Sequence, residues 1–147
     1  MISHDITSLD QLRDFAVGVL SSINPHDGQA FTITLSGDLA AGKTTFTQKL
    51  GELLGIEKDE INSPTYVIEQ RYPLDTHESF SELVHIDAYR LELDGDPIKI
   101  GLNHTLKDPT KLVVIEWPEK IEKFLQDYKK MEITLSLEGD KRIAQVK

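Results

Sequence analysis

Cysteine is absent from the 147-residue chain, which excludes disulfide bonds, thiolate nucleophiles and thiolate zinc sites. The five histidines show no H-x-x-x-H pairing, so a structural zinc site is not expected. No apolar run approaches the roughly 18 residues that a membrane-spanning helix needs. The first ten residues also lack the basic cluster and apolar stretch of a secretory signal. We therefore expect a cytoplasmic protein that does not cross a membrane.

Positive charge is scarce as well. Sixteen Lys and Arg residues stand against 25 Asp and Glu, which gives a formal net charge of −9. Such a surface repels a nucleic-acid backbone unless its charge is locally segregated, so strong autonomous nucleic-acid binding is disfavoured. The remaining composition, 39% hydrophobic and 28% charged, is ordinary for a globular protein. The length and the lack of linkers or repeats predict a single domain over residues 1–147.

Hydrophobic periodicity in the first third of the chain predicts a helix, a strand and a second helix. A capping box at Ser8 and apolar residues at helical spacing predict a helix over residues 9–22. Residues 31–35 alternate as a strand does. Residues 46–54 carry apolar side chains on one helical face, and Gly55 is placed to end that helix.

The rest of the chain is predicted to consist mainly of strands. The polar stretch 73–82 suits a hairpin connection between two antiparallel strands, and the apolar run 112–115 suits a strand buried on both faces. Pro118 is well placed as the first residue of a helix. The predicted elements are strands at 65–72, 83–89 and 112–115, a helix from 118 to about 128, and a closing hairpin of strands at 131–137 and 142–146.

The segment between the first strand and the second helix matches the pattern G-x-x-x-x-G-K-[ST]. Gly37 and Gly42 permit backbone angles that let successive N–H groups converge on phosphate oxygens. Lys43 adds a positive charge, and the Thr44 hydroxyl is placed to bind Mg²⁺. The sequence therefore predicts a site for a nucleoside triphosphate and Mg²⁺. The predicted nucleotide-binding residues are Gly37, Asp38, Leu39, Ala40, Ala41, Gly42, Lys43, Thr44 and Thr45.

A phosphate loop of this kind also needs a carboxylate at the end of a neighbouring strand to hold the water shell of the metal. Two predicted strands qualify, one ending at Asp87 and the other at Glu116. The second strand is the more apolar, so Glu116 is the preferred metal-side carboxylate. Asp87 is then a second acid near the metal or organises the attacking water. With Lys43, these two acids are the predicted catalytic residues.

Three further features bear on the site. His85 is interpreted as a satisfied strand residue rather than a base. Trp117, the only tryptophan, either packs in the core or contacts a partner or the nucleotide. The loop at Ser63, Pro64 and Thr65 has the features of a nucleotide-sensing switch whose threonine hydroxyl could reach the metal or the terminal phosphate, with a plain turn as the alternative.

Two absences narrow the class of nucleotide-binding protein. The chain has no N-K-x-D motif, which is the usual guanine-reading motif, so a Ras-type GTPase is disfavoured. The stretch at residues 94–110 is too short for the lid and acceptor-binding subdomain of a small-molecule kinase.

Four motifs, in order, resemble the TsaE family, the bacterial ATPases of tRNA threonylcarbamoyladenosine biosynthesis. They are G-D-L-A-A-G-K-T-T at 37–45, S-P-T-Y at 63–66, H-I-D-A-Y-R at 85–90 and V-I-E-W-P-E at 114–119. The resemblance covers most of the chain from the first core strand to the last helix. It implies an α/β P-loop NTPase fold with three layers and a mixed parallel and antiparallel sheet.

The resemblance also implies a function. In that family the partners TsaD and TsaB transfer the carbamoyl group to the adenosine beside the tRNA anticodon, while TsaE binds and hydrolyses ATP with Mg²⁺. The expected activity is an ATPase that is weak alone and stimulated by these partners, which would hold the tRNA. Two alternatives stay open: a nucleotide-dependent binding switch in which hydrolysis only resets partner binding, and a small-molecule phosphotransferase.

Carried over by motif position, Lys43 and Thr44 hold phosphate and Mg²⁺, Thr45 supports the loop, and Asp87 and Glu116 serve the metal and water. The chain departs from the family pattern at two places. Ala40 stands where the family usually has glycine, and Asn103-His104 follow Gly101-Leu102 where the family usually has an acid.

Overall fold

The computed structural model describes residues 2–23, 28–38, 41–61, 69–75, 77–91 and 101–147. Their strands form one sheet in the order β1-β7-β6-β2-β5-β4-β3. The strands are β1 (Ile2–Asp5), β2 (Phe31–Ser36), β3 (Glu69–Pro73), β4 (Glu82–Asp87), β5 (Lys111–Glu116), β6 (Met131–Glu138) and β7 (Lys141–Val146). The helices are α1 (Leu9–Ser21), α2 (Lys43–Leu53), α4 (Leu102–Leu106) and α5 (Glu122–Leu125), with 3-10 turns η1 (Lys58–Glu60), η2 (Ala88–Arg90) and η4 (Pro118–Ile121).

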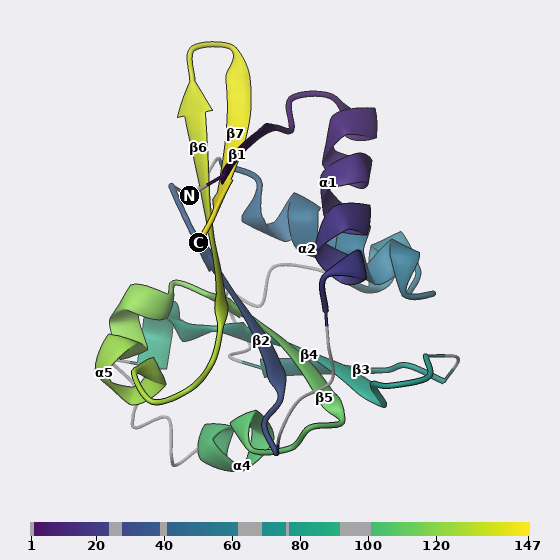
Figure 1. The fold of residues 1–147 in the computed structure, drawn as a ribbon, viewed down its shortest axis with the longest axis vertical. Helices are drawn as coiled ribbons and strands as arrows, with labels where there is room; N and C mark the ends of the chain where they lie inside the picture. The colour runs from purple at the N-terminus through teal and green to yellow at the C-terminus, as the bar shows by residue number, and fades with distance from the viewer. Residues whose placement is uncertain (1, 24–27, 39–40, 62–68, 76, 92–100) are drawn as a thin grey trace.

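The sheet is mixed. Strands β6, β2, β5 and β4 run parallel in its centre, whereas β1–β7, β6–β7 and β3–β4 are antiparallel pairs. The twisted sheet separates α1 and α2 on one face from α4 and α5 on the other (Figure 1). This arrangement confirms the predicted α/β class, the three layers and the mixed sheet.

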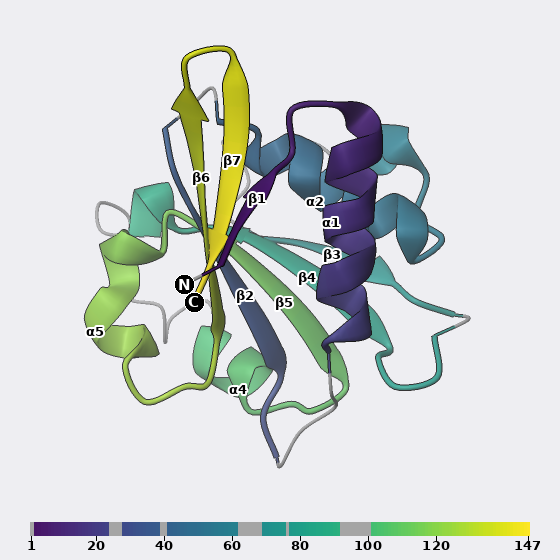
Figure 2. The ribbon, with the colours of Figure 1, turned by 45° about the horizontal axis from the view of Figure 1, so that its top comes forward.

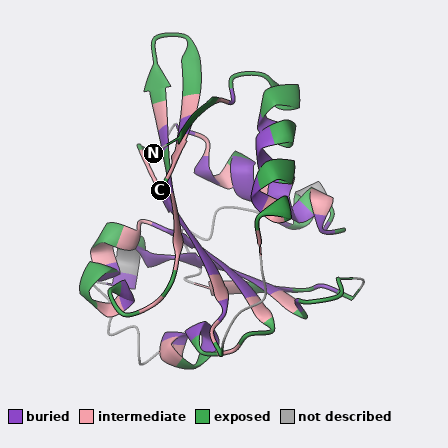
Figure 3. Ribbon diagram, viewed as in Figure 1, coloured by how far each residue is buried: buried purple, intermediate pink, exposed green. Residues whose placement is uncertain are grey.

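Two apolar clusters fill the space between these layers, and β4 and β5 contribute alternate side chains to both. On β5, Leu112 and Val114 join the α1 and α2 side, while Val113 and Ile115 join the α4 and α5 side. The strand is buried over most of its length for this reason, as the run 112–115 predicted. Figure 3 shows the same concentration of buried residues along the central strands.

Local signals explain where the two long helices begin and end. The Ser8 hydroxyl accepts from the backbone N–H of Gln11, and the Gln11 side chain accepts from the backbone N–H of Ser8, which is the predicted capping box. Helix α2 ends where Gly55 adopts a left-handed φ of 93°. The N–H of Ile56 then donates to the carbonyl of Gly51 at 2.8 Å, as in a Schellman motif.

Two predicted elements need correction, and two observed elements were not predicted. The strand predicted at 83–89 ends at Asp87, because its carboxylate accepts from the N–H of Tyr89 and starts the turn η2. The helix predicted from 118 to 128 is a 3-10 turn followed by the short α5, which ends at Leu125. Strand β1 and helix α4 were not predicted. The strand predicted at 65–72 is present from Glu69, and its earlier part lies outside the described residues.

Strand β1 shows why the amino terminus was missed. Its residues are mostly exposed, so its sequence has no buried alternation, and the strand is held by backbone pairing to β7, with Ile2 opposite Val146. Figure 2 shows the two chain ends side by side as a result. Across the parts of the chain that the structure describes, no helix has the length and apolarity to span a bilayer.

Candidate nucleotide-binding site

The parallel strands β2, β5 and β4 end at the same edge of the sheet, which brings their following residues together. Leu35 of β2 pairs with Glu116 of β5, and Glu116 pairs with Asp87 of β4. The phosphate-loop motif begins two residues after Leu35. Ligands of open α/β sheets bind at this edge, outside the carboxyl ends of parallel strands.

The glycine positions of the loop have the backbone conformations that the motif requires. Gly37 has a φ of 141° and Gly42 a φ of 99°. A Cβ at Gly37 would collide with the carbonyl oxygen of Leu135 on β6. Gly42 precedes α2, where no side chain caps the helix and the first turn contains no acidic residue. The helix therefore directs its N-terminal partial positive charge at the loop without a carboxylate to offset it.

Lys43 lies inside the loop rather than in solvent. The residue is 4% exposed, and its Nζ donates to the carbonyl of Gly37 at 2.6 Å. The same nitrogen lies 3.7 Å from the ring centroid of Trp117. Burial lowers the pKa of Lys43, and this effect is opposed by the negative charges of nearby carboxylates, Glu116 first among them. An anionic ligand in the loop would stabilise the charged form.

Asp87 and Glu116 are both buried, at 6% and 3% exposure. Their register on neighbouring strands puts their side chains on the α2 side of the sheet, like Leu83 and Val114. Burial raises the pKa of Asp87, and the charge of Glu116 raises it further, against the hydrogen bond from Tyr89 and the charges of His85 and Lys43. A pair of buried carboxylates of this kind is stabilised by a cation.

His85 is hydrogen bonded to one of these carboxylates. Its Nε2 lies 2.5 Å from Oε2 of Glu116, and the His85 side chain is fully buried. The interpretation of His85 as a satisfied strand residue holds for Nε2. Its Nδ1, in contrast, has no hydrogen-bond partner among the described residues. The period of two along β4, which puts His85 on the same face as Asp87, was the signal that could have linked it to the site.

Trp117 combines a rare backbone conformation with a position beside Lys43. Its φ of 58° makes it the one non-glycine residue of the described segments with a positive φ. The indole is half-buried and packs edge-to-face on Tyr89, with ring centroids 5.2 Å apart. Trp117 belongs to neither apolar cluster, so core packing does not describe it, and its contact with a nucleotide or a partner stays a prediction.

The oxygen-rich donor set suits Mg²⁺. The described residues hold no group of three or more His, Cys, Asp or Glu side chains that could ligate a metal. Mg²⁺ does not need one, since it usually takes one or two carboxylates together with waters and substrate phosphates. Asp87, Glu116 and the Thr44 hydroxyl at the start of α2 are therefore a sufficient protein contribution.

Some predicted residues are not placed at this site. Leu39, Ala40, Ser63, Pro64 and Thr65 lie outside the described residues. The departure at Asn103-His104 lies on α4, beside the beginning of β2, where the N–H of Ala30 donates to the carbonyl of Leu106. That position is at the opposite end of the parallel strands from the phosphate loop. Asn103 and His104 therefore do not contribute to the site described above.

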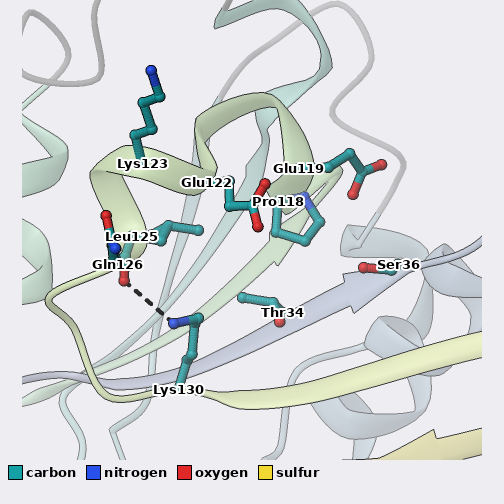
Figure 4. Close-up of a pocket in the computed structure, with 9 residues that line it drawn as sticks. All are labelled: Thr34, Ser36, Pro118, Glu119, Glu122, Lys123, Leu125, Gln126 and Lys130. Carbon is teal, nitrogen blue, oxygen red and sulfur yellow. Dashed lines mark hydrogen bonds between the residues drawn. The ribbon is translucent and has the colours of Figure 1, made fainter.

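A separate pocket of about 540 Å³ lies on the other face of β2. Thr34 and Ser36 form its floor, because they alternate with Leu35, which points toward α2. Figure 4 shows these residues facing η4 and α5. Its lining includes none of Lys43, Asp87 and Glu116, so it is distinct from the convergence of Lys43 with the acids. Its lining is Thr34, Ser36, Pro118, Glu119, Glu122, Lys123, Leu125, Gln126 and Lys130.

Comparison with known protein families gives a match over most of the chain. Residues 6–144 match the model of the family described as "Threonylcarbamoyl adenosine biosynthesis protein TsaE". The chain belongs to the TsaE family. This confirms the resemblance that the four sequence motifs carried.

Three bacterial relatives are each named tRNA threonylcarbamoyladenosine biosynthesis protein TsaE. The Streptomyces coelicolor protein is 40% identical over 103 residues, which are 69% of this chain and 66% of the relative. The Bacillus subtilis protein is 35% identical over 108 residues, covering 74% and 63%. The Rickettsia conorii protein is 30% identical over 144 residues, covering 97% and 76%. The match thus spans slightly less than two thirds of the first two TsaE proteins.

The crystal structure of Bacillus subtilis YdiB has the same fold. It superposes with a TM-score of 0.69 at 23% identity and covers 99% of this chain and 83% of YdiB. The likeness supports the P-loop NTPase fold of the TsaE family for this chain.

Proposed function

We propose that this protein is a Mg²⁺-dependent ATP-binding and ATP-hydrolysing subunit that supports threonylcarbamoylation of the adenosine beside the tRNA anticodon. Its activity is stimulated by TsaD and TsaB, and tRNA is held by the complex rather than by this chain alone. Membership of the TsaE family supports the pathway. The site geometry supports the nucleotide chemistry.

The observation that carries the proposal is the convergence of one buried lysine and two buried acids at the end of the phosphate-loop strand. Burial lowers the pKa of Lys43 despite the charges of Glu116 and other carboxylates, so a bound anion would stabilise its charged form. Asp87 and Glu116 carry excess negative charge that a bound cation would neutralise. A Mg²⁺–triphosphate supplies both missing charges at once, which fits the site better than either ion alone.

The roles of the residues follow from their positions. The N–H groups at the start of α2 and Lys43 bind the β- and γ-phosphates, and Thr44 contributes its hydroxyl to the metal. Bound Mg²⁺ would neutralise charge that develops on the phosphate oxygens. Glu116 and Asp87 would hold the waters of a bound metal and orient the attacking water. The ordered donors act by preorganised electrostatics, so each is expected to matter on the order of 10²-fold.

Hydrolysis measured with and without partners tests the proposal. We expect slow phosphate release by the isolated protein and a strong rise when cognate TsaB and TsaD are added. Lys43→Ala and Glu116→Gln should each lower the stimulated rate by on the order of 10²-fold. Full activity in either variant would show that the site assignment is wrong, and a lack of stimulation by cognate partners would argue against the partner-activated ATPase.

The packing of Lys43, Trp117 and Tyr89 against one another favours a second function, a nucleotide-dependent binding switch. The Lys43 Nζ lies on Trp117, Trp117 packs on Tyr89, and Tyr89 is 47% exposed. A phosphate that draws Lys43 away from the indole would therefore alter packing that reaches the surface. Comparing TsaB–TsaD binding with ADP and with a non-hydrolysable ATP analogue tests it, because a switch requires different affinities in the two states. Equal affinities would exclude the switch.

A further inference from the structure

A histidine at position 85 adds no stability to the fold relative to an apolar residue. The residues around it on β4, Leu83, Val84 and Ile86, are all buried and apolar. An apolar residue would fill this place without a polar cost, whereas the fully buried imidazole has an Nδ1 without a hydrogen-bond partner in the described segments. Leaving one buried polar atom unsatisfied typically costs about 1–3 kcal/mol. The stability of the sheet therefore does not explain a histidine here.

The single hydrogen bond that His85 makes points to its use. Strand register pairs His85 with Val114 and Asp87 with Glu116. The imidazole therefore lies on the same face of the sheet as the two acids, two residues before Asp87 along β4. From there its Nε2 reaches Oε2 of Glu116 at 2.5 Å. Because a carboxylate only accepts hydrogen bonds, Nε2 is the donor in this pair. The bond occupies one carboxylate oxygen and leaves Oε1 for the metal's water shell.

We propose that His85 is a positioning residue that fixes the carboxylate of Glu116 in the orientation required for Mg²⁺–nucleotide binding and hydrolysis. This inference rests on the proposed function and adds a residue to that site. Outer partners of metal-binding groups commonly contribute 10–100-fold to affinity or activity by setting ligand orientation. Without this hydrogen bond, the buried Glu116 carboxylate would lose the donor that holds its orientation, and the charge of nearby Lys43 would favour other rotamers.

Two substitutions separate positioning from packing. His85→Leu fills the buried position without a donor, whereas His85→Gln places an amide N–H where Nε2 lies. With TsaB and TsaD present, we expect His85→Leu to lower kcat by about 10–100-fold. His85→Gln should recover most of the lost kcat. His104→Leu, at an exposed histidine on α4, is the matched control and should behave as the wild type.

Two measurements do not depend on turnover. The free energy of unfolding without ligand should change little in His85→Leu, because removal of the unpaired Nδ1 offsets loss of the hydrogen bond to Glu116. Calorimetric titration with ADP in the absence of Mg²⁺ should give the wild-type affinity, whereas the gain in affinity that Mg²⁺ produces should be reduced. If His85→Leu does not fold, His85→Met serves in its place as a donor-free variant.

A double-mutant cycle with Glu116→Gln decides whether His85 acts through Glu116. We expect His85→Leu to have little further effect on kcat in the Glu116→Gln background. Additive losses, a His85→Gln variant as weak as His85→Leu, or a fall in stability that parallels the fall in kcat would each overturn the proposal. A wild type that shows no Mg²⁺-dependent nucleotide binding would instead overturn the proposed function, and the inference with it.

Discussion

Replacing Asp87 by asparagine is expected to stabilise the ligand-free protein and weaken its function. Asparagine keeps an oxygen that can accept from the N–H of Tyr89, so the turn after β4 is retained. What is lost is a buried negative charge beside Glu116. Substitutions that remove a destabilising group from a functional site typically raise the free energy of unfolding by about 0.5–2 kcal/mol. At about 1 kcal/mol, the melting temperature at pH 7 should rise by roughly 2–4 °C.

Ligand should reverse this order. At ADP and Mg²⁺ concentrations about 100-fold above the wild-type Kd, binding stabilises the wild type by about 2.7 kcal/mol. If Asp87→Asn weakens binding tenfold, the variant gains only about 1.4 kcal/mol at the same concentrations. Its advantage in the ligand-free state is then offset. Thermal unfolding followed by circular dichroism, with and without Mg²⁺–ADP, measures both effects.

The effect of the Asp87 charge on protein stability should depend on pH. The pKa of Asp87 is raised above the ordinary value near 3.8, so the folded protein holds a proton there that the unfolded chain has already released. Wild-type stability therefore falls, relative to Asp87→Asn, as pH rises through that window. The gap between the two proteins should close as the pH is lowered toward 4.

Asp108→Asn is a control of opposite sign, because hydrogen bonds from Thr110 lower the pKa of Asp108. The contribution of Asp108 is present above the ordinary carboxyl pKa and is lost on acidification, so this variant should be no more stable than the wild type at pH 7. An Asp87→Asn protein that melts below the wild type at pH 7 without ligand would refute the reasoning about Asp87.

Three further substitutions test the phosphate-loop backbone and the helices α1 and α2. Gly37→Ala should weaken ADP binding by roughly tenfold or more in calorimetry, because the new Cβ collides with the Leu135 carbonyl at a φ that favours glycine. Gly51→Ala should lower stability by about 1 kcal/mol, since the clash with Ile61 outweighs the gain in helix propensity, and adding Ile61→Val should relieve part of the loss. Ser8→Ala should cost about 1 kcal/mol in urea unfolding through loss of the capping box, and an unchanged midpoint would contradict that role.

Elements with strong local signals were predicted correctly from the sequence. The capping box at Ser8, the glycine at Gly55 and the apolar run 112–115 each act within a few residues, so their consequences do not depend on distant parts of the chain. Strand β1 was missed because backbone pairing with β7 stabilises it, and its own sequence pattern does not indicate a strand. Helix α4 was missed because it is stabilised by the packing of Leu102 and Leu106 in an apolar cluster formed by distant parts of the chain.

The sequence by itself determined the phosphate-loop motif, because the backbone freedom of Gly37 and Gly42 and the charge of Lys43 are properties of those residues. It also named Asp87 and Glu116, since acids that follow apolar strands can be recognised from local pattern. Only the tertiary structure decided which groups meet. The register of β4 on β5 aligned the two acids and brought His85 to Glu116, and the fold placed the Nζ of Lys43 over the ring of Trp117. Such contacts depend on strand order and register, which arise from the packing of the whole sheet and not from any one segment.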